Sequence, residues 1–88
     1  MTSERNKAYS DAQAALAMLK ASVRTILETG PSEGMRNVEI GKTLGIYGGH
    51  VEHVGHISRT ILAVMESEGV VTQNPDSKKW KLVEHWTV

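Results

Sequence analysis

The chain has 88 residues, about half of the roughly 150 typical of one domain, so we expect it to form a single small domain. Hydrophobic residues make up 40% of it and charged residues 23%, a globular rather than a disordered composition. Ten basic residues balance ten acidic ones, there is no cysteine, and no apolar run approaches the roughly 20 residues of a membrane span. We therefore expect a soluble, cytoplasmic domain without disulfides, cysteine-ligated zinc or a membrane partner.

The first predicted element is a helix that begins at Ser10 or Asp11, since either residue is a suitable N-cap. Its apolar residues recur at helical spacing, at Ala12, Leu16, Leu19, Val23 and Ile26. Gly30 and Pro31 end the helix, because glycine readily takes the left-handed conformation and proline cannot continue a helix. The polar residues 1–9 are expected to form a flexible N terminus.

A second, two-turn helix is predicted after the loop 31–36. Asn37 is its expected N-cap and Gly45 closes it. The following stretch, 46–55, is rich in glycine and has no sustained period, so the sequence does not predict its conformation.

The third predicted helix has about four turns and ends at Glu68 and Gly69. Its apolar face is expected to consist of Val54, Ile57, Ile61, Val64 and Met65. Two β-prone runs, 70–73 and 78–83, follow it and are separated by the turn residues 74–77, which predicts a β-hairpin.

In the second run of this hairpin, Trp80 and Leu82 alternate with Lys79 and Lys81. Since successive side chains of a strand point to opposite faces, one face of the hairpin is predicted to be apolar and the other cationic. The domain is thus expected to span 10–83, followed by a C-terminal tail at 84–88.

This order of elements resembles the winged helix-turn-helix domains of bacterial transcription regulators. The stretch 39–45, Glu-Ile-Gly-Lys-Thr-Leu-Gly, is similar to the first helix and turn of that motif. The stretches 57–62 and 68–71 are similar to the recognition helix and its entry into the first wing strand. The resemblance covers about 10–83 and implies a mainly α fold with a small β-hairpin: three helices and a two-stranded wing.

The resemblance also implies that the third helix enters the major groove of double-stranded DNA. Steps of about 100° per residue place Arg59 at the centre of the face opposite the apolar stripe. The candidate contacts on this helix are His56, Arg59, Thr60 and Ala63. The alternative is an ordinary solvated face, which Glu52 and Glu66 favour because phosphates repel carboxylates.

The family joins the two helices of the motif with a few residues, whereas ten residues, 47–56, intervene here. The DNA-facing positions therefore depend on where the third helix begins. His50, His53 and His56 recur at every third residue of this region. They are candidates for DNA contacts whose protonation between about pH 5.5 and 7 adds positive charge, and a metal site is not expected.

The hairpin lysines Lys78, Lys79 and Lys81 form the largest basic excess of the chain. Lysines beside a hairpin tip suit phosphates on either side of a groove, although they also protect an exposed strand from aggregation. Arg36 is a further candidate for a DNA contact.

We find no nucleophile elbow, no cysteine and no phosphate-binding glycine motif, so neither an enzyme nor a cofactor is expected. The leading hypothesis is a small transcriptional regulator that binds double-stranded DNA sequence-specifically. The alternative is a winged-helix module that binds protein instead. A homodimer through the first helix is also predicted, because Ala14, Ala17 and Ala21 leave a smooth surface there.

Overall fold

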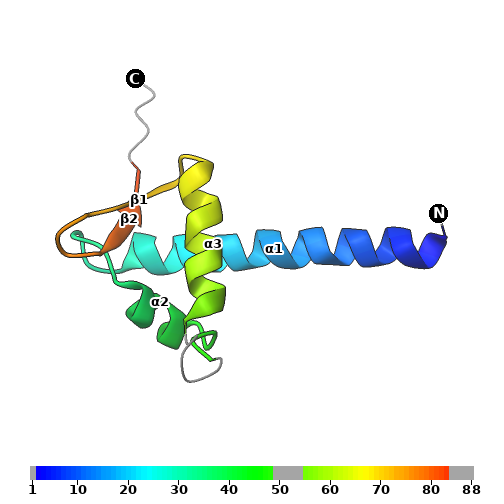
Figure 1. The fold of residues 1–88 in the computed structure, drawn as a ribbon, viewed down its shortest axis with the longest axis horizontal. Helices are drawn as coiled ribbons and strands as arrows, with labels where there is room; N and C mark the ends of the chain where they lie inside the picture. Colours follow the sequence, from blue (N-terminus) through cyan, green and yellow to red (C-terminus); the bar gives the residue numbers. More distant parts are fainter. Residues whose placement is uncertain (1, 49–54, 84–88) are drawn as a thin grey trace.

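A computed structural model describes residues 2–48 and 55–83 (Figure 1). Its elements, in chain order, are α1 (Ser3–Thr29), α2 (Asn37–Thr43), α3 (His56–Ser67), β1 (Val71–Gln73) and β2 (Trp80–Leu82). The strands pair antiparallel, with Thr72 opposite Lys81. The described part of the chain is therefore mainly helical, with three helices and a two-stranded hairpin, as predicted, and this arrangement is compatible with a winged-helix layout.

α1 begins at Ser3, seven residues before the predicted start at Ser10. The Oγ1 atom of Thr2 accepts a hydrogen bond from the backbone N–H of Arg5 at 3.3 Å and so caps the first turn. Lys7 and Asp11 form an ion pair at 2.9 Å across the next turn. Residues 3–9 are therefore helical, and not the flexible N terminus predicted from the sequence.

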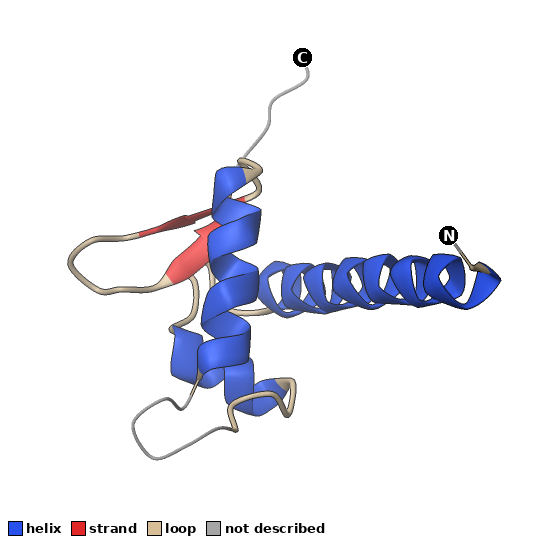
Figure 2. Cartoon of the chain, turned by 45° about the vertical axis from the view of Figure 1, so that its right-hand side comes forward, coloured by secondary structure: helices blue, strands red, loops and turns tan. Residues whose placement is uncertain are grey.

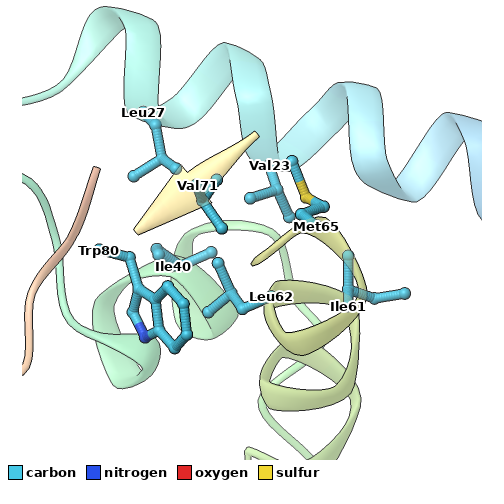
Figure 3. Close-up of a cluster of buried hydrophobic side chains, with 8 residues drawn as sticks. All are labelled: Val23, Leu27, Ile40, Ile61, Leu62, Met65, Val71 and Trp80. Carbon is cyan, nitrogen blue, oxygen red and sulfur yellow. The ribbon is translucent and has the colours of Figure 1, made fainter. Parts of the chain in front are cut away.

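The core lies where the second half of α1 meets α2, α3 and the hairpin (Figure 3). Its buried apolar side chains are Val23, Leu27, Ile40, Ile61, Leu62, Met65, Val71 and Trp80. Every residue from 2 to 15 is exposed, and the first half of α1 extends away from the rest of the fold (Figure 2). Among the described residues, no helix has both the length and the apolar character needed to cross a membrane.

The N-cap of α2 is Arg36, not Asn37 as predicted. The backbone N–H of Arg36 donates a hydrogen bond of 2.8 Å to the Glu39 carboxylate, which satisfies the start of this helix. The side chain of Asn37 is instead directed to α3, where it contacts Ser58. At the other end, Gly45 has a positive φ of 73° and follows the helix as expected.

The buried face of α3 is rotated from the predicted stripe. It consists of Ser58, Ile61, Leu62 and Met65. Ile57, predicted to be in the core, is 48% exposed, and Val54 lies outside the described residues. With about 100° per residue, the centre of the outer face lies between Thr60 and Ala63, and Arg59 is about 70° from that centre.

The hairpin turn forms as predicted from 74–77. The Asn74 side-chain oxygen accepts hydrogen bonds from the backbone N–H groups of Asp76 at 2.8 Å and Ser77 at 3.0 Å. Trp80 is buried and Lys81 is exposed, which confirms the predicted alternation along β2, while Lys79 is half-buried.

A backbone bridge on the other edge of β2 was not predicted. The N–H of Met35 donates to the Trp80 carbonyl at 2.9 Å, and the Trp80 N–H donates to the Met35 carbonyl at 2.7 Å. The preceding Gly34 has a φ of 96°, and a Cβ at this position would lie only 2.2 Å from the Trp80 carbonyl oxygen. The loop before α2 is thus fastened to the hairpin at a point that requires glycine.

Candidate nucleic-acid interface

The outer face of α3 carries all four helix residues singled out from the sequence. His56, Arg59, Thr60 and Ala63 are exposed, and the opposite face of the helix is buried in the core. Thr60 donates its hydroxyl proton to the His56 carbonyl at 2.9 Å, which leaves the hydroxyl oxygen to accept from a partner. Near the centre of this face, the small side chain of Ala63 permits close approach of a ligand.

The acidic residues of this helix lie at its C-terminal end. Between Gly55 and Met65 there is no acidic residue, and Glu66 is the first carboxylate along the helix. Glu68, just beyond the helix, pairs with Lys20 of α1 at 3.0 Å. Within α3, repulsion between carboxylates and DNA therefore concerns the last turn only, and Glu52, the other carboxylate named from the sequence, lies outside the described residues.

The three hairpin lysines are positioned by the turn and by β2. Lys78 is exposed at the turn with a φ of 66°, a left-handed conformation that non-glycine residues rarely adopt. Lys79 and Lys81 line a shallow hollow of about 270 Å³ together with Thr72 and Glu33. The hollow faces away from the core, since these residues alternate with the buried Trp80.

Glu33 changes the local charge of this surface. The three lysines and Asp76 of the hairpin carry a formal charge of +2, and Glu33, from the loop before α2, reduces it to +1. The sequence alone did not indicate this neighbour, because Glu33 reaches the hairpin only through the bridge between Met35 and Trp80.

α2 adds two cations beside α3. Arg36, a candidate from the sequence, is exposed at the N-cap of α2. Lys42 was not a candidate, yet it is exposed in the last turn, and its Nζ atom lies 5.7 Å from the centre of the Tyr47 ring. A signal for Lys42 existed in the sequence, since it lies within the stretch 39–45 that resembles the first helix of the motif.

His50 and His53 lie outside the described residues. Within the described ranges, no group of three histidine, cysteine, aspartate or glutamate side chains is placed to hold a metal ion.

Comparison of the chain with models of protein families, with curated proteins and with solved structures gives no match. The class that the described elements define is a small, mainly helical domain with a hairpin, and its candidate site is the outer face of α3, with the exposed cations of α2 and the hairpin as candidate backbone contacts.

Proposed function

We propose that this chain binds double-stranded DNA sequence-specifically, as a small transcriptional regulator of the winged-helix type. The observation that supports the proposal most is the outer face of α3. It is exposed, it has small or hydrogen-bonding residues at its centre, and it lacks acidic residues from 55 to 65. The other face of the same helix is fixed by the core.

In this proposal α3 lies in the major groove. A helix with its side chains is about 10–12 Å across, which matches a groove about 12 Å wide. Thr60 and His56 hydrogen-bond to base edges, and Ala63 contacts a thymine methyl group. Arg59, at the side of the outer face, has a side chain long enough to reach a guanine at the edge of the contact.

The hairpin contacts the phosphate backbone rather than the bases. Lys78, Lys79 and Lys81 supply the charge there, and Arg36 and Lys42 supply it from α2. Each neutralised phosphate makes the slope of log K against log salt more negative by about 0.9, where K is the association constant. About four contacts therefore give a slope of roughly −3 to −4. Because the chain as a whole carries no net charge, its attraction to DNA must come from these local cations.

The test is a fluorescence anisotropy titration with a duplex selected from random sequence and with a scrambled duplex of equal length, each at two salt concentrations. We expect tighter binding to the selected duplex and the stated salt slope for both. Lys7→Ala is the matched control, because Lys7 lies on the exposed first half of α1, away from the proposed interface. Absence of binding at low salt would contradict the proposal.

The second candidate function is binding to another protein, and the exposed surface of α1 favours it. Tyr9 is 67% exposed and Met18 is 70% exposed, on a helix whose first half has no cover from the described chain. Reading DNA does not require this segment. The proposed homodimer would use Ala14, Ala17 and Ala21 of the same helix, all of them exposed.

Sedimentation at tens of micromolar tests this surface separately from DNA. A dimer that becomes a monomer on Ala17→Glu supports self-association. A strict monomer removes the homodimer from the proposal and leaves the DNA titration to decide the first function.

A further inference from the structure

The first turn of α3 is held to α2 by a small polar cluster within an otherwise apolar contact. Ser58 is fully buried, and its hydroxyl oxygen lies 2.7 Å from Oδ1 of Asn37 and 3.2 Å from the Gly55 carbonyl oxygen. A hydroxyl has one proton, so the shorter contact, to Asn37, is the stronger hydrogen bond. The Nδ2 group of Asn37 in turn donates to the Gly55 carbonyl at 3.2 Å. The three residues thus form a closed ring of contacts.

Gly41 and the Tyr47 ring pack against this cluster, and Gly55 is part of it. A Cβ at Gly41 would lie 2.8 Å from the Ser58 hydroxyl and 2.8 Å from the Tyr47 ring. A Cβ at Gly55 would lie 2.5 Å from the Tyr47 ring and 2.8 Å from Nδ2 of Asn37. Because both positions are in close contact with their surroundings, the cluster has little room to change its geometry.

The cluster lies where the chain enters α3. Gly55 has a φ of 77°, and its carbonyl also accepts the first backbone hydrogen bond of the helix, from Arg59 at 3.0 Å. The entry to α3 is thereby tied to Asn37, the first residue of α2, independently of the connection between the two helices.

A buried polar pair contributes little net free energy to the contact between two helices. Burying a hydroxyl and an amide costs desolvation, and its net stabilisation is about 1 kcal/mol per hydrogen bond, less than a well-packed apolar pair contributes. Hydrogen bonds are directional, however, so they restrict the orientation of α3 more than apolar contacts do. Orientation is the property that reading base edges requires.

We propose that Asn37 and Ser58 are positioning residues for DNA reading: they set the orientation of α3 on α2 without touching the DNA. The inference rests on the proposed function, since it assigns to these residues part of the sequence preference of that site. Ser58 is fully buried on the core side of α3 and is thereby kept from the DNA.

The first test compares Ser58→Ala, Asn37→Ala and the double variant in the two-duplex titration. Each single variant lowers the ratio of selected to scrambled affinity about tenfold, the equivalent of one base contact, and leaves the scrambled affinity within about twofold. The double variant should lose less than the product of the two single losses, because both single variants remove the hydrogen bond between Ser58 and Asn37. Ser22→Ala is the matched control: it removes a 2.9 Å bond from an exposed hydroxyl to the Met18 carbonyl of α1.

Asn37→Ala is less apt to disturb folding than Ser58→Ala, because Asn37 is only half-buried. In this variant the Ser58 hydroxyl keeps the Gly55 carbonyl as a partner. All variants are compared at a temperature at which circular dichroism shows each to be folded. An unchanged affinity ratio in Asn37→Ala and Ser58→Ala would overturn the proposal, as would two effects that multiply in the double variant.

A second readout needs no DNA. Amide hydrogen exchange in Ser58→Ala accelerates about tenfold at Arg59 and Thr60 and stays unchanged at Val23 of α1. Equal acceleration at all three amides would mean a general loss of stability and would overturn the positioning role. If the unaltered chain fails to bind DNA, the proposed function fails, while the exchange experiment still decides whether the cluster fixes α3.

Discussion

α3 and the hairpin both present exposed residues to a ligand, but the fold holds them differently. α3 spans twelve residues and is fixed by four buried side chains, one of which is hydrogen-bonded to α2. The hairpin has strands of three residues, and its residues 74–76 and Lys78 are exposed. Trp80 and Val71 are its buried anchors.

This difference matches two ways of contacting DNA. Hydrogen bonds to base edges depend on orientation, so they require a rigidly held element, whereas contacts to phosphates depend mainly on charge. In the proposed function, α3 therefore reads the sequence and the hairpin contacts the backbone.

The largest effect is expected for the anchor of α3. Leu62→Ala removes a fully buried side chain and should lower the free energy of unfolding by about 2–5 kcal/mol. Ile57→Ala, on the same helix but 48% exposed, should cost less than about 1 kcal/mol. Urea denaturation measures both. A larger loss in Ile57→Ala than in Leu62→Ala would show that the register of α3 is the one predicted from the sequence, with Ile57 in the core.

The anchor of the hairpin is tested at Gly34. Gly34→Ala adds a Cβ that would meet the Trp80 carbonyl at 2.2 Å, at a φ of 96°. We expect the free energy of unfolding to fall by about 2–3 kcal/mol, from the steric clash and the left-handed strain together. Gly45→Ala is the control, because its φ is 73° but nothing lies within 4 Å of the added carbon. For this control, urea denaturation should show a fall of about 1 kcal/mol in the free energy of unfolding. The same loss in both variants would mean that the clash is relieved elsewhere.

A smaller effect is expected at the hairpin turn. Lys78→Gly relieves a left-handed φ of 66° and should stabilise the fold by about 0.5 kcal/mol, since the greater freedom of glycine in the unfolded chain offsets part of the gain. It should also flatten the salt slope of DNA binding by about one. Lys78→Ala removes the same charge without relieving the strain, so only the salt slope should change. Stabilisation by both variants would refute the strain argument.

Local patterns predicted several features correctly. The end of α1 at Gly30 and the hairpin turn at Asn74 depend on residues adjacent in the chain, and both are found, although Gly30 is extended, with a φ of −92°, and not left-handed as predicted. The start of α1 was missed because residues 3–9 carry no apolar period, and the interactions found there are the Thr2 cap and one exposed ion pair.

Contacts between distant residues could not be predicted in this way. Ser58 is buried because Asn37 accepts its proton, and neither residue signals a core position in the sequence. For the same reason the register of α3, and with it the centre of the candidate site, was misplaced by about 70°. The approach of Glu33 to the lysines depends likewise on the pairing of Met35 with Trp80.

The central claim is that α3 reads the sequence while the hairpin supplies charge, and a pair of variants tests it most directly. Binding curves for Arg59→Ala and Lys79→Ala are measured on a selected duplex and on a scrambled one, at two salt concentrations. Arg59→Ala should weaken the binding free energy by about 1–3 kcal/mol for the selected duplex and by far less for the scrambled one. Lys79→Ala should weaken both equally and flatten the salt slope by about one. An unchanged ratio of the two affinities in Arg59→Ala would contradict the claim that α3 reads bases through this residue.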